Sequence, residues 1–175
     1  MIRLKTVVVI NGSGGSGKDT FVGFVSKIIS TVNVSSVDKV KEAASVLGYE
    51  GEKSEKDRQF LNTIKNASVQ YNDFPFKDIV SAIGKFLTSN NEVLFIHIRE
   101  PKEINKVKSL LNSYLSVVVH FMTVLVQNSN VPMVISNEAD ANVNEYKYDY
   151  VVDNSGTIAD LKEEAESFVD YIKNL

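Results

Sequence analysis

The feature that most constrains the fold lies near the start of the chain, where an apolar segment leads directly into a glycine-rich one. Residues 6–10 are all β-branched, and Gly12-Ser13-Gly14-Gly15-Ser16-Gly17-Lys18 follows them. Residues 21–29 then carry apolar side chains at helical spacing. This order predicts a buried strand whose carboxyl end opens into an anion-binding turn and a helix.

The spacing of Gly12, Gly17 and Lys18 is that of a phosphate-binding loop, or P-loop. Glycines let successive backbone N–H groups turn toward an anion, and the following helix adds the positive end of its dipole. Lys18 is expected to reach the terminal phosphates of ATP and to act in catalysis. A turn without a ligand is the alternative, but such a turn does not require glycine at both ends and a lysine directly after. We expect ATP to bind through the segment Gly12, Ser13, Gly14, Gly15, Ser16, Gly17, Lys18, Asp19 and Thr20.

Asp19 stands where P-loops normally carry the Ser or Thr that ligates Mg²⁺. A carboxylate is also a good oxygen ligand for Mg²⁺. It is equally favoured at a helix N-terminus by the helix dipole, so two interpretations of Asp19 stay open. The hydroxyl of Thr20 remains able to bind a phosphate oxygen.

Apolar β-branched runs alternate with helical patterns along the rest of the chain. Such alternation predicts right-handed βαβ crossovers and therefore an α/β fold of three layers, α/β/α, with a five-stranded parallel sheet, as in P-loop NTPases. Ligands in such folds bind at the carboxyl ends of the strands. The predicted strands are 6–10, 32–35, 92–98, 116–126 and 148–152, and the predicted helices are 21–29, 37–47, 56–70, 76–87, 103–111 and 157–172.

The domain organisation follows from length and segment composition. The 175 residues fit one domain, 1–175, with a helical insert over about 49–91 and a polar, Asn-rich lid candidate over about 127–145. The insert has more helical segments than a crossover needs, which is typical of a substrate pocket.

Charge and cysteine content exclude several function classes. The chain has 19 basic and 22 acidic residues and no cysteine. It therefore lacks the basic character of a nucleic-acid binder, and it has no disulfide, zinc-thiolate site or cysteine nucleophile. No apolar run is long enough to span a membrane. We expect a cytoplasmic protein with small-molecule nucleotide substrates, without nucleic-acid or membrane partners; the oligomeric state is left open.

The run Gly17-Lys18-Asp19-Thr20 resembles the P-loop of the deoxynucleoside monophosphate kinases of phages and bacteria. That family belongs to the P-loop kinase group, with adenylate kinase and dephospho-CoA kinase. Residues 57–61, 98–103 and 149–157 are similar, in order and context, to three further segments of the family. The resemblance therefore extends over nearly the whole chain, although only its P-loop is specific.

The resemblance implies a phosphotransferase that moves the γ-phosphoryl of ATP to a nucleoside or deoxynucleoside monophosphate. It implies that Arg58 and Arg99 bind the acceptor phosphate, Arg99 also acting in catalysis, and that the loop at Asn154 lies near the donor base. Guanidinium groups suit this role because they bind phosphate oxygens in pairs. Asp38, just after the second predicted strand, is placed to meet the acceptor or to cap the next helix.

Two departures from the family pattern leave other functions open. His97 stands where the family has an Asp that helps to hold Mg²⁺, and neutral imidazole is a poor magnesium ligand. The lid candidate has no Lys or Arg to stabilise the transferred phosphoryl group. A kinase of another small molecule, such as dephospho-CoA, and a catalytically weak nucleotide-binding regulator are the alternatives.

The remaining candidates have structural explanations of similar weight. Tyr146, Tyr148 and Tyr150 alternate, which predicts that they lie on one face of a strand, there to stack on a base or to pack against the last helix. The acids of residues 137–140 lie in the lid candidate. His120 is expected to be structural.

Overall fold

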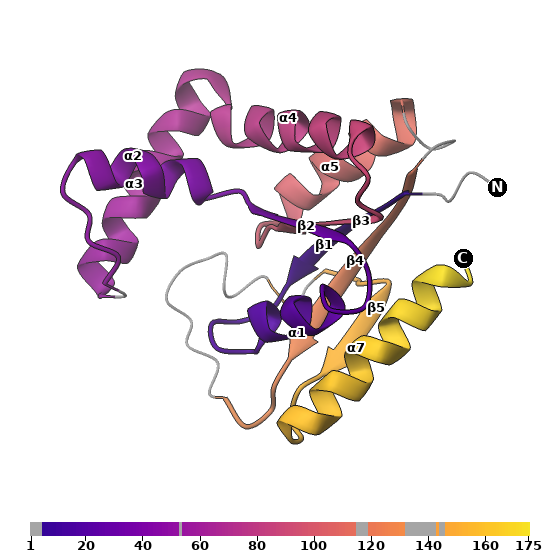
Figure 1. The fold of residues 1–175 in the computed structure, drawn as a ribbon. Coiled ribbons are helices and arrows are strands. Elements are labelled where there is room, and N and C mark those ends of the chain that lie inside the picture. The colour runs from indigo at the N-terminus through magenta and orange to yellow at the C-terminus, as the bar shows by residue number, and fades with distance from the viewer. Residues whose placement is uncertain (1–4, 53, 115–118, 132–142, 144–145) are drawn as a thin grey trace.

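The computed structural model describes residues 5–52, 54–114, 119–131, 143 and 146–175 (Figure 1). Its strands are β1 (Lys5–Asn11), β2 (Thr31–Ser35), β3 (Val93–His97), β4 (Val119–Gln127) and β5 (Tyr150–Asp153). Its helices are α1 (Lys18–Val25), α2 (Asp38–Val46), α3 (Glu55–Asn72), α4 (Phe74–Thr88), α5 (Pro101–Tyr114) and α7 (Ile158–Lys173). None of the described helices is both long and apolar enough to cross a membrane.

The strands form one parallel sheet in the order β2-β3-β1-β4-β5. β1 is central and pairs with β3 on one side and β4 on the other, which explains why residues 7–10 are continuously apolar. The predicted five-stranded parallel sheet is confirmed. The central position of β1 places the glycine-rich loop in the middle of the sheet's carboxyl edge.

Helices cover both faces of the sheet, as the three-layer prediction requires. Val8 and Ile10 point to the face covered by α1 and α7, where Phe21 and Phe168 meet edge to face at 5.4 Å. Val7 and Val9 point to the opposite face, which α4 and α5 cover (Figure 1). Thr157 begins α7 with a capping box, accepting a hydrogen bond from the backbone of Asp160.

Helix α1 is shorter than predicted. The apolar pattern extends to Ile29, but the helix ends at Val25, and Ile28 is exposed. After Val25 the backbone tightens into i→i+3 hydrogen bonds, Lys27 to Phe24 and Ile28 to Val25. The early end lets the chain turn so that β2 begins at Thr31 beside β3.

The predicted insert over about 49–91 contains α3 and α4, and α2 precedes it. These three helices leave the sheet after β2 and return before β3 (Figure 1). The predicted break between the last two helices is confirmed at Asp73, which has a left-handed backbone, φ 54°. α4 packs on the sheet through Ile79, Ile83 and Phe86. α3, by contrast, contains no buried side chain.

The prediction that Tyr146, Tyr148 and Tyr150 lie on one strand face is wrong. β5 begins only at Tyr150, so the alternation of a strand does not extend to the other two. Tyr150 packs against Phe168 and Tyr171 of α7, whereas Tyr146 packs with the core on the other side of the sheet.

Lys5 closes the carboxyl end of α4, and its replacement tests that contact. Its ammonium donates to the carbonyls of Phe86, Ser89 and Asn91 at 3.0, 2.7 and 2.8 Å. Lys5→Met is expected to lower the free energy of unfolding by about 1.5–3 kcal/mol, because three carbonyls lose a charged donor. Urea denaturation measures this. Lys27→Met, which removes an exposed lysine near the Phe24 ring, is the control; equal stability of the two variants would contradict the prediction.

Candidate functional site

The glycine-rich loop joins β1 to α1 at the carboxyl edge of the sheet. Gly12, Gly15 and Gly17 have φ values of 150°, 80° and 94°, a region that L side chains rarely adopt. The loop stays close to its own strand, because the backbone N–H of Gly12 donates to the side chain of Asn11 at 2.8 Å.

Two of these glycines are also required by space. A Cβ on Gly12 would lie 2.3 Å from the backbone oxygen of Val126 in β4. A Cβ on Gly17 would lie 2.2 Å from the side-chain nitrogen of Asn154. The loop is therefore packed against the end of β4 and against Asn154, which follows β5.

Lys18 lies across this loop. Its ammonium donates to the carbonyls of Gly12 and Ser13 at 2.6 and 2.9 Å. Ser16 is fully buried, and among the described residues its hydroxyl has no hydrogen-bond partner. Glycine backbone, a lysine ammonium and a hydroxyl with unused hydrogen-bonding capacity are donors of the kind that phosphate oxygens accept. The residues present fit a nucleotide polyphosphate.

Asn154 holds the loop from the outside. Its side chain donates to the carbonyl of Ser16 at 2.9 Å, and its backbone N–H donates to Gln127 at 2.8 Å. The structure thus places Asn154 beside the P-loop, where its hydrogen bonds link the loop to the ends of β4 and β5.

Asn11 is a further residue that the sequence reasoning missed. It is completely buried, and its amide donates to the carbonyl of Arg99 at 3.1 Å and to the hydroxyl of Tyr148 at 2.8 Å. Burial raises the pKa of Tyr148 to about 12, so that hydroxyl stays protonated and donates to Val143. The sequence signal that could have identified Asn11 was its position as a single amide residue between an apolar strand and a glycine.

His97 lies at the end of β3, on the side of the sheet that faces α1. Its Nε2 is 2.8 Å from the side-chain oxygen of Asn33 in β2. Burial lowers its pKa, and the charge of Lys18 acts in the same direction, while Asp19 and Asp38 oppose it. Lys41 is a further cation that lowers this pKa. His97 is thus a neutral imidazole at neutral pH, beside the start of α1.

The lowered pKa of His97 predicts a loss of stability in acid. The unfolded chain takes up a proton near the ordinary value of 6.5, while the folded protein does so only at lower pH. The contribution of His97 to the free energy of unfolding is therefore complete above pH 6.5 and falls as the pH drops below that value. His97→Gln is expected to flatten the pH dependence of urea unfolding below pH 6.5. His120→Gln is the control, and an unchanged slope in His97→Gln would refute the assignment.

The acidic candidates lie near this histidine. Asp19 is exposed in the first turn of α1. Asp38 begins α2 and accepts a hydrogen bond from the backbone of Ser35 at 2.7 Å. Within the described residues, no three His, Asp or Glu side chains gather as a metal site would require. Asp19 directly follows Lys18 of the P-loop.

The two arginine candidates lie on different elements. Arg99 follows β3, half-buried, with its carbonyl held by Asn11. Arg58 is exposed in the first turns of α3. A cation missed by the sequence reasoning, Lys65, lies about two turns further along α3 and donates to the carboxylate of Glu100.

Most of the lid candidate, including the acids of residues 137–140, lies outside the described residues. The part that is described joins the loop after β5: the backbone and hydroxyl of Ser129 donate to the hydroxyl of Ser155 at 2.9 and 2.8 Å. A pocket of about 330 Å³ lies between these loops and reaches Ser13 of the P-loop.

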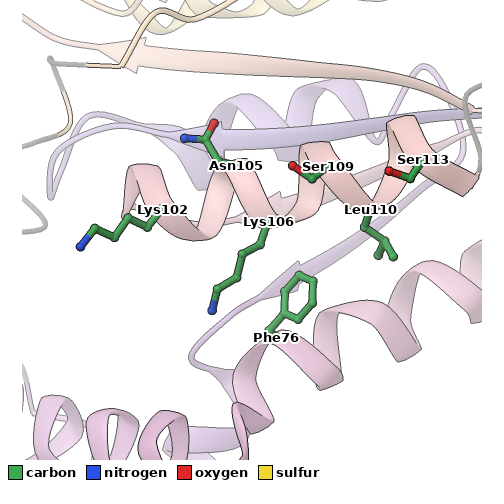
Figure 2. A pocket seen from close by; sticks show the side chains of 7 residues that line it. All are labelled: Phe76, Lys102, Asn105, Lys106, Ser109, Leu110 and Ser113. Carbon is green, nitrogen blue, oxygen red and sulfur yellow. The ribbon is translucent and has the colours of Figure 1, made fainter.

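A second hollow lies away from the P-loop, between α4 and α5. Figure 2 shows Phe76 of α4 pointing toward α5, whose residues Lys102, Lys106 and Leu110 line the other side. The ammonium of Lys106 lies 5.5 Å from the centre of the Phe76 ring and pairs with Asp73 and Glu103, at 2.9 Å each. No candidate site residue lines this hollow.

Comparison with known proteins identifies the fold. No protein-family model matches the chain, and no curated protein matches it. Among solved structures, shikimate kinase from Acinetobacter baumannii in complex with shikimate matches with a TM-score of 0.53 at 9% identity, over 99% of this chain and 95% of that one. The crystal structure of APE1195 matches with a TM-score of 0.51 at 14% identity, over 99% of this chain and 98% of the other. The chain has a P-loop kinase-like fold.

Proposed function

We propose that the chain is an ATP-dependent phosphotransferase whose acceptor is a nucleoside or deoxynucleoside monophosphate. One observation carries the proposal: Lys18 lies across a loop in which Gly12, Gly15 and Gly17 have positive φ, at the centre of the sheet's carboxyl edge. A side chain at Gly12 or Gly17 would clash with its neighbours. In a P-loop kinase-like fold this loop is the place for the transferred phosphoryl group. The small-molecule acceptor belongs on the facing side, toward the insert.

In this proposal the donor lies along the P-loop. Backbone N–H groups and Lys18 bind the β- and γ-phosphates of ATP, with Thr20 beside them, and the nucleoside end extends toward the loops after β4 and β5 near Asn154. Asp19 would hold Mg²⁺, which supplies positive charge against the phosphate oxygens. The charge of Lys18 follows the phosphoryl group as it moves.

The acceptor phosphate is assigned to Arg99 and Arg58, with Asp38 on the side of its sugar or base. An oxygen of that phosphate attacks the γ-phosphorus in line, the bond to the β-phosphate oxygen breaks, and ADP leaves. Arg99 acts in catalysis by positioning the attacking oxygen. No covalent intermediate forms on the protein.

A second candidate is a nucleotide-binding regulator with little or no turnover. The observation that favours it is His97, which is neutral and bonded to Asn33 at the position where the resemblance leads one to expect an acid. Such a protein would keep the P-loop and bind ATP without a complete magnesium site.

One experiment separates the candidates. ADP release is measured over a panel of nucleoside and deoxynucleoside monophosphates, and ATP binding is measured separately by calorimetry. Turnover with one or more monophosphates supports the kinase. Tight ATP binding without any turnover overturns it in favour of the regulator, and the absence of ATP binding overturns both.

A further inference from the structure

Lys65 of α3 is paired with the segment that follows β3 at the carboxyl edge of the sheet. Its side chain is only 13% exposed, and it forms an ion pair with Glu100, whose side chain is 32% exposed. Glu100 directly precedes α5 and directly follows Arg99. α3 has no buried side chain of its own, and this ion pair joins it to the segment between β3 and α5.

The pair is connected to the P-loop through one residue. The carbonyl of Arg99 accepts a hydrogen bond from Asn11, and Asn11 in turn accepts one from the backbone of Gly12. Lys65 therefore lies over a segment whose position is fixed relative to the P-loop. Arg58, about two turns earlier on α3, lies on the same side of that helix as Lys65.

We infer that Lys65 binds the anionic group of the phosphoryl acceptor, and that Glu100 occupies its ammonium until the acceptor arrives. The inference rests on the proposed function and deepens it by naming a further residue that binds the acceptor phosphate and the carboxylate that competes with it. A phosphate monoester carries nearly two negative charges and three acceptor oxygens, so it competes successfully with one carboxylate for a lysine. A neutral hydroxyl compound does not. The pair therefore selects acceptors that carry a phosphate group.

A structural role and a binding role of the Lys65–Glu100 pair predict different changes in acceptor affinity when each residue is replaced. If the pair only holds α3 in place, removal of either partner breaks it and weakens acceptor binding alike. If Glu100 competes with the acceptor, its neutralisation releases Lys65 and strengthens acceptor binding, whereas loss of Lys65 weakens it. The direction in which neutralisation of Glu100 changes acceptor affinity therefore shows whether Lys65 only positions α3 or binds the acceptor.

The experiment compares Lys65→Met, Lys65→Arg and Glu100→Gln. With the best monophosphate of the panel, Lys65→Met is expected to raise the acceptor KM about tenfold or more and to leave the KM for ATP unchanged, since it removes a charged hydrogen bond. Glu100→Gln is expected to lower the acceptor KM several-fold, and Lys65→Arg to retain most of the affinity. Lys106→Met is the matched control, since it breaks an ion pair between α5 and Asp73, the residue between α3 and α4.

The inference can fail while the proposed function survives. Equal weakening by Lys65→Met and Glu100→Gln, with turnover intact, overturns it, as does an acceptor KM that neither variant changes. If no monophosphate is turned over, binding of inorganic phosphate is measured by calorimetry with the P-loop filled by a non-hydrolysable ATP analogue. Weaker phosphate binding in Lys65→Met and tighter binding in Glu100→Gln then support the anion site; no phosphate binding to the unmodified protein overturns it.

Discussion

Lys18→Ala is expected to reduce phosphoryl transfer by about 10²- to 10³-fold, the loss that follows removal of one preorganised charge from a transition state. The lysine is the charged donor that lies directly over the P-loop, bonded to Gly12 and Ser13. ADP release under saturating ATP and acceptor measures the change in kcat. ATP binding should also weaken, because the β- and γ-phosphates lose the same ammonium.

Lys162→Ala is the matched control for this experiment. Lys162 is 63% exposed on α7, where its partner is Glu166 at 3.7 Å, and exposed pairs of this kind contribute little. Both variants should have the circular dichroism of the unmodified protein. A kcat for Lys18→Ala within a factor of about two of the control would contradict the role of Lys18 in stabilising the transferred group.

Gly12→Ala is expected to lower the free energy of unfolding by about 3 kcal/mol or more. The new methyl group would lie 2.3 Å from a backbone oxygen of β4, which cannot rotate away, and φ at this residue is 150°. Overpacking and a disfavoured backbone conformation each cost about 1–3 kcal/mol. Urea denaturation measures the loss.

Gly14→Ala is the control within the same loop. A Cβ on Gly14 meets no atom within 4 Å, and Gly14 is not among the glycines with positive φ. Its stability should therefore change by about 0.5 kcal/mol or less, as at other open surface positions. Similar losses in the two variants would show that the packing of Gly12 against β4 does not determine the stability of the loop.

The architecture could be predicted because its signals are local. Buried parallel strands are continuously apolar, and the helices carry their apolar residues at regular spacing, so α/β order and the five strands follow from pattern alone. The end of α1 could not be predicted in this way. Ile28 and Ile29 continue the helical spacing, but the start of β2 is fixed by its pairing with β3, a contact distant in sequence.

The same distinction between local patterns and contacts distant in sequence applies to the candidate site. The P-loop was recognisable because its glycines and lysine are consecutive in the chain. The roles of Asn11 and Lys65 depend on partners 88 and 35 residues away, Arg99 and Glu100. A buried amide and a lysine in a polar helix have no pattern of their own, so only the folded chain brings these partners together.

The absence of buried side chains in α3 has a consequence for how the molecule unfolds. A helix attached mainly through half-buried and ionic contacts opens locally at a lower free energy than the central strands. Amide protons of α3 are therefore expected to exchange through local opening of that helix, whereas those of β1 are expected to exchange only when the whole sheet opens. We therefore expect the helix on the side assigned to the acceptor to open before β1, the strand that leads into the P-loop.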